Sequence, residues 1–159
     1  MDLGLADKVA VVVGGSRGIG LAAATMFAGE GACVPIAARE QKVLGEAATQ
    51  IAREGREPLA LACDGADSAS VARMMQTVAD RLGGIDILIN TIGNAAGGNF
   101  LNLTDEGWDD SLSIKLHGQI CCSRSAIPFM RARRRRQSQR DRTPRQAAGR
   151  PRIAGECRQ

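Results

Sequence analysis

The chain has 159 residues, the length of one domain, and an apolar fraction of 44% that is ordinary for a soluble globular protein. No run is long and apolar enough to span a bilayer, and residues 1–7 lack the basic start and apolar core of an export signal. These features argue against a membrane-spanning or exported protein and predict a cytoplasmic location.

The net charge of +4 is unevenly distributed along the chain. Residues 131–159 hold 11 arginines against Asp141 and Glu156, so this segment carries a charge of +9. Residues 1–130 hold the other 10 basic residues against 15 acidic ones and carry a charge of −5. The body is therefore a mildly acidic domain, and the C-terminal segment alone makes the protein basic.

Apolar runs with the character of strands alternate with helical patterns along the first 90 residues. The predicted strands are Val9–Val13, Ala32–Ala38, Pro58–Cys63 and Ile85–Asn90. Between them, apolar residues recur at helical spacing within Ile19–Phe27, Leu44–Ile51 and Val71–Leu82. Ser68 is predicted to cap the third of these helices.

This alternation predicts an α/β fold, a Rossmann-type doubly wound parallel sheet that stops after the fourth strand and the helix that follows it. Pro35 lies inside the second predicted strand. Because proline has no backbone N–H to donate to a ladder, it predicts a bulge or a weaker sheet at that position.

Regular patterns continue beyond the fourth strand and then disappear. A loop rich in glycine and asparagine spans 91–102, and a helix is predicted to begin near Thr104 and to run toward Pro128. From about Arg131 neither helical nor strand periodicity is kept. The predicted division is an incomplete Rossmann domain over residues 1–131 and a disordered, arginine-rich tail over 132–159.

A glycine-rich turn joins the first predicted strand to the first predicted helix. Glycines allow a phosphate to approach the backbone, and the free N–H groups and positive dipole end of the following helix attract it. The turn follows a strand and opens a helix, which is the context that the dinucleotide-binding fingerprint requires. The predicted cofactor-binding residues of the turn are Gly14, Ser16, Arg17, Gly18, Ile19 and Gly20.

The end of the second strand distinguishes the two nicotinamide cofactors. An acidic residue there binds the ribose 2′-hydroxyl of NAD, whereas a 2′-phosphate calls for arginine. Arg39 follows this strand and Arg17 lies in the turn, so two cations favour NADP(H). Glu40 is the counter-candidate for NAD(H). The alternative without a cofactor is that Arg39 and Glu40 form an ordinary solvated start to the second helix.

The chain resembles the short-chain dehydrogenase/reductase family over about residues 5–131. The markers are the glycine turn, Asp64 after the third strand, Asn90–Gly93 after the fourth, and residues 100–109 leading into the next helix. The resemblance implies NADP(H)-dependent hydride transfer to a carbonyl or from an alcohol, as in 3-oxoacyl reductases. It also implies that Asp64 lies beside the adenine ring and that Asn90 and Gly93 support the cofactor ribose and the centre of the sheet.

The catalytic residues that the resemblance implies are absent from this sequence. The family uses a serine, a tyrosine and a lysine four residues after the tyrosine, but the chain has no tyrosine and its last lysine is Lys115. Lys115 occupies the position of the asparagine in the family's catalytic tetrad, and a charged lysine only donates hydrogen bonds. His117, the only histidine, has no acidic or cysteine partner at triad spacing. No catalytic residue is assigned, and the five cysteines show no zinc spacing.

Three functions therefore stay open. The first is an oxidoreductase of the short-chain family that is inactive because this chain is truncated. A complete chain of this kind would act on a small carbonyl or alcohol and could form a homo-oligomer. The second is a non-catalytic NADP(H)-binding remnant. The third, less favoured, is a nucleic-acid binder with a basic tail, although the tail has no aromatic residue for stacking on bases.

A shifted reading frame explains the tail better than a nucleic-acid arm does. The family usually continues here with Gly-Gly-x-Ile-Val-Asn-Ile-Ser. If the reading frame shifts by one base near Arg133, consecutive CGN arginine codons can become glycine codons. In the same shifted frame, the codons of Gln137–Arg140 can encode Arg-Val-Asn-Val, which resembles the family's next strand. Because this chain lacks the family's fifth strand, its fourth strand is predicted to be an uncovered edge of the sheet.

Overall fold

The centre of the molecule is a four-stranded parallel sheet in the order β3-β2-β1-β4. The computed structural model describes residues 3–93 and 97–142. The strands are β1 (Ala10–Val13), β2 (Ile36–Ala38), β3 (Ala60–Ala62) and β4 (Ile87–Asn90). All four strands lie within the predicted runs, and the doubly wound α/β fold is confirmed.

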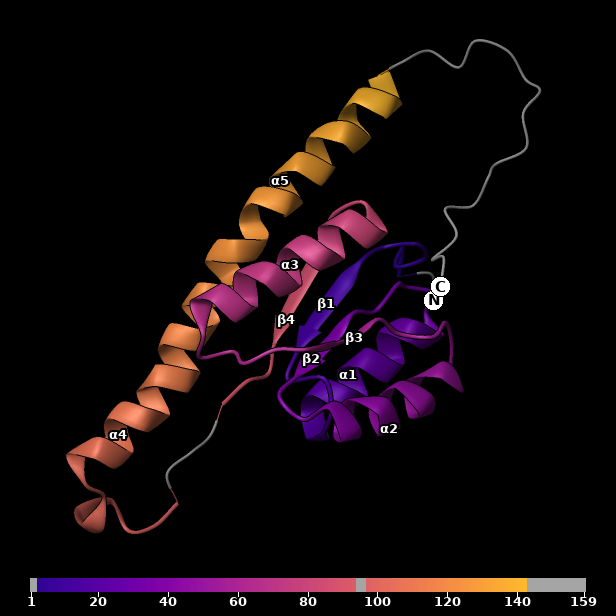
Figure 1. The fold of residues 1–159 in the computed structure, drawn as a ribbon. Helices are drawn as coiled ribbons and strands as arrows, with labels where there is room; N and C mark the ends of the chain where they lie inside the picture. Colours follow the sequence, from indigo (N-terminus) through magenta and orange to yellow (C-terminus); the bar gives the residue numbers. More distant parts are fainter. Residues whose placement is uncertain (1–2, 94–96, 143–159) are drawn as a thin grey trace.

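Helices cover both faces of the sheet (Figure 1). Helices α1 (Gly18–Gly29) and α2 (Gln41–Ala52) cover one face, and α3 (Ser68–Leu82) and the long α5 (Gln119–Arg142) cover the other. Between β4 and α5 lie a short 3-10 helix, η1 (Phe100–Asn102), then α4 (Asp105–Leu112) and a π-helical segment, η2 (Ser113–Gly118). None of the helices in the described ranges combines the length and apolar character needed to cross a membrane.

Strand β1 separates two hydrophobic cores because its side chains alternate between the faces of the sheet. Val11 and Val13 pack in the core beneath α3 and α5, whereas Val12 packs in the core beneath α1 and α2. Every residue of β1 is at most 1% exposed. A continuous apolar run is what a strand buried on both faces requires, so the Ala-Val-Val-Val sequence accounts for the central position of β1.

The second strand is shorter than predicted because of Pro35. Cys33 forms an isolated bridge with Val9, and regular pairing resumes only at Ile36. The carbonyl of Pro35 still accepts a 2.8 Å hydrogen bond from the N–H of Val12. Proline therefore contributes an acceptor but no donor, and the ladder is interrupted at the position where the sequence predicts a weak point.

Helix α3 begins with a different cap from the predicted one. The carboxylate of Asp67 accepts a 2.9 Å hydrogen bond from the N–H of Ala69, so Asp67 is the N-cap and Ser68 is the first helical residue. The prediction of Ser68 as N-cap is wrong by one position. Thr104, near which the later helix was expected to begin, is the N-cap of α4 and accepts from the N–H of Gly107 at 3.2 Å.

Helix α5 extends farther than its sequence pattern indicates. It continues past Pro128 and through the arginine run to Arg142, whereas the pattern predicts that regular structure ends near Arg131. Arginine is a good helix former, and two side chains of the run bond to the end of α3. Arg133 donates to the carbonyl of Leu82 at 2.9 Å, and Arg136 donates to that of Gly83 at 2.8 Å. Residues 143–159 of the predicted tail lie outside the described residues.

Candidate functional site

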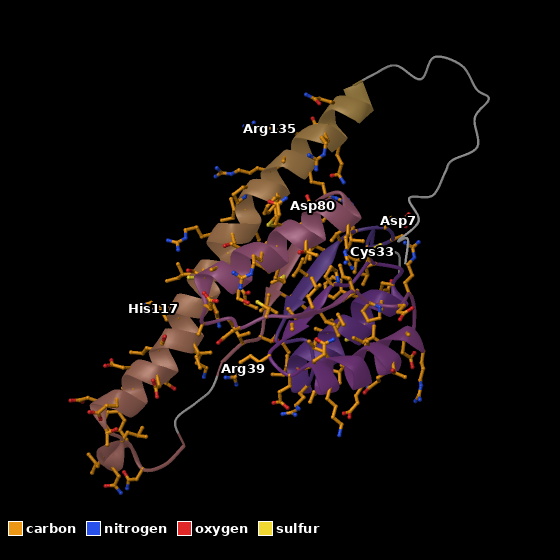
Figure 2. All side chains as sticks on the ribbon, viewed as in Figure 1. Asp7, Cys33, Arg39, Asp80, His117 and Arg135 are labelled. Atoms are coloured by element: carbon orange, nitrogen blue, oxygen red, sulfur yellow. The ribbon has the colours of Figure 1, made fainter. Side chains whose placement is uncertain are left out.

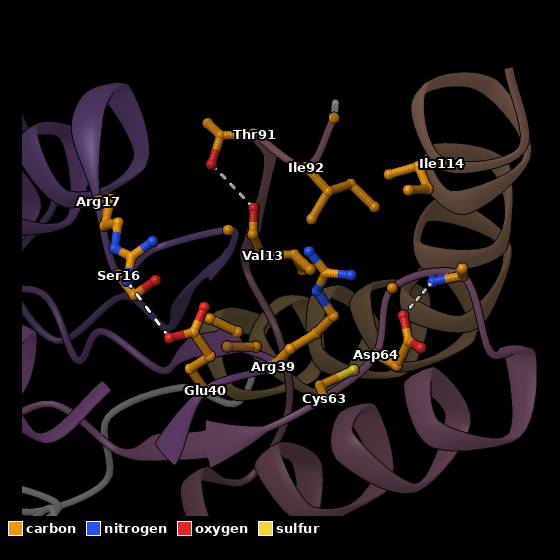
Figure 3. Close-up of a pocket in the computed structure, with 16 residues that line it drawn as sticks. Val13, Ser16, Arg17, Arg39, Glu40, Cys63, Asp64, Thr91, Ile92 and Ile114 are labelled. Carbon is orange, nitrogen blue, oxygen red and sulfur yellow. Dashed lines mark hydrogen bonds and ion pairs between the residues drawn. The ribbon is translucent and has the colours of Figure 1, made fainter. Parts of the chain in front are cut away.

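A cavity of about 290 Å³ lies at the carboxyl ends of the four strands (Figure 3). Ligand sites of open α/β sheets occur at this edge, where the strand order reverses. Here the order reverses between β1 and β4. The lining residues come from the last residues of β1 and β2, from the segments that follow all four strands, and from η2. They are Val13, Gly14, Ser16, Arg17, Ala37, Ala38, Arg39, Glu40, Cys63, Asp64, Gly65, Ala66, Thr91, Ile92, Gly93 and Ile114.

The glycine turn brings the start of α1 to this cavity. Gly14 and Gly18 have φ angles of 88° and 52°, which other residues rarely adopt. A side chain at Gly18 would meet no atom within 4 Å, so its surroundings stay open to a ligand. No side chain caps the start of α1 and its first turn holds no acidic residue, so its N–H groups and dipole can receive an anion.

Packing explains the other two glycines of the fingerprint. A Cβ at Gly14 would lie 2.7 Å from Oγ1 of Thr91, and a Cβ at Gly20 would collide with the carbonyl of Gly14. Thr91 itself donates a 2.9 Å hydrogen bond to the carbonyl of Val13. These contacts hold the turn tightly against the end of β4. Gly18, Ile19 and Gly20 do not line the cavity, and Ile19 is 82% exposed.

Two arginines and one glutamate form the polar end of the cavity. Arg17 and Glu40 make an ion pair at 3.4 Å, and their side chains are 68% and 67% exposed. Arg39 extends into the pocket in Figure 3 and makes no ion pair with any side chain of the described segments. The structure therefore brings together the three charged residues that the sequence proposes as determinants of cofactor choice.

Asp64 lies on the opposite side of the pocket at the end of β3. Its carboxylate accepts a 3.0 Å hydrogen bond from the N–H of Ala66, and its own N–H donates to Oγ of Ser70 at 3.2 Å. These bonds fix the turn and leave the exposed carboxylate at the cavity wall. Beside it, burial raises the pKa of the Cys63 thiol above its ordinary value, although a hydrogen bond with Ser70 opposes this shift.

Asn90 does not line the cavity, unlike Gly93. Its Nδ2 donates to Oγ of Ser123 on α5 at 3.3 Å, and its Oδ1 is buried without a hydrogen-bond partner in the described part of the chain. Asn90 thus joins β4 to α5 beside the pocket. At the pocket itself, the aliphatic part of Lys115 packs against Gly93, where a Cβ would lie 3.0 Å from Cγ of the lysine.

Several pocket residues were not predicted from the sequence. Ala37 and Ala38, Cys63, Thr91, Ile92 and Ile114 line the cavity alongside the predicted residues. Most of them are apolar or small and carry no chemical signature. All of them except Ile114 lie at or just after a strand end, and the carboxyl edge of a parallel sheet collects such residues. That position could have identified them, whereas Ile114 lies on η2 and offered no comparable signal.

The remaining candidate groups form no second site. His117 is exposed on η2 and points away from the sheet in Figure 2. Cys63 and Cys122 are buried free thiols in the core beneath α3 and α5. Among the described residues there is no group of three or more histidine, cysteine, aspartate or glutamate side chains that could hold a metal ion.

Comparison with known proteins supports this description of the fold. A family model described as short chain dehydrogenase matches residues 8–138. The chain is 35% identical over 131 residues to the monensin polyketide synthase putative ketoacyl reductase of Streptomyces virginiae, covering 81% of this chain and 50% of that protein. It is 33% identical over 124 residues to meso-2,3-butanediol dehydrogenase of Serratia marcescens, covering 78% and 49%.

Solved structures show the same relationship. L-sorbose reductase from Gluconobacter frateurii, solved with NADPH and L-sorbose, has a TM-score of 0.77 and 36% identity, covering 84% of this chain and 51% of that one. An NADH-dependent reductase, A1-R′, solved with NAD, has a TM-score of 0.77 and 26% identity, covering 87% and 58%. The chain spans about half the length of the curated relatives it matches. From the match over residues 8–138, the parallel sheet and the glycine turn, the chain belongs to the short-chain dehydrogenase family.

Proposed function

We propose that this domain binds a nicotinamide dinucleotide, with NADP(H) favoured over NAD(H), as the cofactor half of an oxidoreductase that acts on a carbonyl or an alcohol. The observation that carries the proposal is the position of Arg17 and Arg39 at the cavity beside the uncapped start of α1. Arginine beside the end of the second strand is the arrangement that suits a 2′-phosphate.

Each part of the cavity fits one part of the dinucleotide. The Gly14–Gly20 turn and the N–H groups of α1 receive the diphosphate, and Asp64 lies where the adenine end would be bound. Arg17 and Arg39 receive the 2′-phosphate. Ile92, Gly93 and Ile114 line the side of the pocket nearer η2, where the nicotinamide ring would be held. When bound, that ring supplies or accepts the hydride.

The preference for NADP(H) over NAD(H) is proposed from the charged residues of this chain and not from its relatives. Of the two solved relatives described above, one was solved with NADPH and the other with NAD. Arg39 makes no ion pair with the described residues and supports NADP(H), whereas the Glu40 carboxylate beside it supports NAD(H). Two guanidinium groups against one carboxylate leave this end of the cavity with net positive charge, which favours the cofactor with the additional phosphate.

We also propose that the 159-residue chain by itself does not catalyse hydride transfer. A tyrosine hydroxyl is the proton donor and acceptor that the family resemblance implies, and the chain contains no tyrosine. Among the described residues, no group at the cavity replaces it: Lys115 packs its stem on Gly93, and His117 lies on an exposed face. A non-catalytic dinucleotide-binding domain is therefore the second candidate function.

Isothermal titration of the full chain with NADPH and NADH tests the binding proposal. We expect saturable binding of both, with NADPH bound more tightly. Failure of both cofactors to bind a folded chain would remove the proposal, and tighter binding of NADH would reverse the cofactor assignment. Spectrophotometric assays with ketones and 3-oxoacyl thioesters test the second part, where NADPH oxidation above the background would contradict the absence of catalysis.

A further inference from the structure

The outer edge of β4 has no partner strand among the described residues, because the strand order places β4 at one end of the sheet (Figure 1). We propose that this edge, together with a basic groove at its start, binds an acidic segment of another protein in extended conformation, as an added strand. The inference concerns the amino ends of the strands, away from the dinucleotide cavity, and does not rest on the proposed function.

The backbone of β4 offers hydrogen-bonding groups to a further strand. Ile87 donates its N–H to the carbonyl of Val9 at 3.0 Å, on the side where β1 lies. Because successive N–H groups of a strand point to opposite sides, those of Leu88 and Asn90 bracket the next bond to β1 and point away from it. All four residues of β4 are half-buried, whereas β1 is buried. An open edge of this kind is a template for pairing with another extended chain.

A groove of about 500 Å³ lies where β4 begins, between the segment before β1, the start of β4 and helix α5. Its apolar lining comes from Leu5, Ile85, Ile87 and Met130. Side chains of neighbouring strands stabilise a sheet by packing against one another. The groove therefore provides an apolar surface for the side chains of a strand added beside β4.

The same groove carries unpaired positive charge. Lys8, Arg131 and Arg134 line it, and none of the three makes an ion pair within the described part of the chain. The carboxylate of Asp86 also lines the groove, but it is already paired with Arg133. The free charge of the groove is therefore positive, which favours an acidic partner and disfavours a basic one.

Charge argues against two other occupants. A second copy of the chain paired through the same edge would bring its own β4 to the groove, and residues 87–93 include no acidic side chain. Residues 143–159 of the chain itself hold four arginines and one glutamate, so they would add positive charge to the groove. A separate acidic segment is the occupant that matches both the cations and the open edge.

The experiment titrates the full chain with fluorescein-labelled peptides and follows fluorescence anisotropy. The acidic probe is Glu-Glu-Val-Thr-Val-Thr-Val-Glu-Glu, which has strand-forming residues between acidic ends. One control replaces the glutamates with lysines. The other replaces the threonines with prolines, which keeps the charge but removes backbone donors. We expect saturable binding of the acidic probe, at least about tenfold tighter than that of either control. Absence of such binding, or equal binding of a control, would overturn the inference.

The double variant Arg131→Gln/Arg134→Gln tests the groove. Loss of two exposed charges should weaken binding of the acidic probe about threefold to tenfold, and the difference should shrink as sodium chloride is raised. The control Arg124→Gln/Arg135→Gln removes the same charge from exposed positions of α5 outside the groove, and should leave the affinity unchanged. Equal losses in the two double variants would reduce the binding to general attraction by positive charge and overturn the assignment.

Amide hydrogen exchange of the unchanged chain tests the edge directly. The bound acidic probe should slow exchange at Leu88 and Asn90, whereas the N–H of Ile87, already bonded to Val9, should change little. Binding that leaves Leu88 and Asn90 unprotected would overturn the added strand. Binding of a single-stranded DNA oligonucleotide in place of the acidic probe would assign the cations to nucleic acid and would also overturn the inference.

Discussion

Arg133 and Asp86 form an ion pair in which Nε of the arginine lies 2.7 Å from Oδ2 of the aspartate. The side chains are 17% and 10% exposed, and the angle at Nε makes this a charge contact rather than an aligned hydrogen bond. Oδ2 of Asp86 also accepts a 2.8 Å hydrogen bond from the N–H of Val9, and Arg133 donates to the carbonyl of Leu82 at 2.9 Å. One arginine thus connects α5 with the end of α3 and the start of the sheet.

Substitution of Arg133 by alanine is predicted to destabilise the chain. The change leaves the mostly buried carboxylate of Asp86 without its cation and the end of α3 without a donor. Loss of one partner of a buried ion pair costs about 3 kcal/mol in free energy of unfolding. Urea denaturation followed by circular dichroism measures this loss.

The matched control is Arg135→Ala, which removes the same charge from the same helix. Arg135 is exposed and points away from α3 in Figure 2. Its substitution is expected to change the free energy of unfolding by less than about 0.5 kcal/mol. Equal effects of the two substitutions would show that the arginine run contributes only through its total charge.

Substitution of Arg39 by alanine is predicted to weaken NADPH binding while leaving NADH binding nearly unchanged. A charge-assisted hydrogen bond to a phosphate contributes about 1.5 kcal/mol, which corresponds to about a tenfold loss of affinity. Titration of each cofactor measures the two affinities, and Arg53→Ala, an exposed change just beyond α2, serves as control. An equal loss for both cofactors would place Arg39 away from the 2′-position.

The two glycines at the start of α1 are predicted to respond differently to alanine. In Gly20→Ala the new methyl group would collide with the carbonyl of Gly14, and such overpacking costs up to about 3 kcal/mol. In Gly18→Ala the methyl group meets open space, and only the φ of 52° is unfavourable, which costs about 1 kcal/mol. Thermal and urea unfolding compare the two variants. A greater loss in Gly18→Ala would contradict the packing described here.

The buried thiol of Cys122 predicts a loss of stability at alkaline pH. Burial, with a smaller contribution from the nearby Cys63, raises the pKa of Cys122 from its ordinary value of 9.0 to about 11. The folded state therefore holds its proton more strongly than the unfolded state. This contribution to stability is complete below pH 9 and is lost as the pH rises toward about 11.

Urea denaturation between pH 9 and pH 11 measures this dependence, with the limits set by the ordinary and raised pKa of Cys122. Cys122→Ala is expected to reduce the decline in stability across this interval. Cys121→Ala is the control because Cys121 is the neighbouring, half-buried free thiol. If both variants decline as steeply as the unchanged chain, other groups control the alkaline transition.

Local patterns were sufficient to predict the sheet and the glycine turn. An uninterrupted apolar strand such as Val9–Val13 and the glycines that follow it are encoded within a few residues. The extent of α5 was not predicted in this way, because the arginine run keeps no apolar periodicity. The groups that Arg133 contacts, Asp86 and the carbonyl of Leu82, are far from it in the sequence. Cap choice between Asp67 and Ser68 was likewise ambiguous, since both residue types favour that position.

The cavity at the strand ends has a consequence for the cooperativity of the fold. Its wall is contributed by the segments after β1, β2, β3 and β4, so one bound molecule would link all four strands. A ligand that binds only the folded state adds about 2.7 kcal/mol to stability at a hundredfold excess over its Kd. Because that energy is shared by the whole sheet, a saturating dinucleotide would raise the melting temperature of every folded variant that keeps the pocket, wherever in the domain the substitution lies.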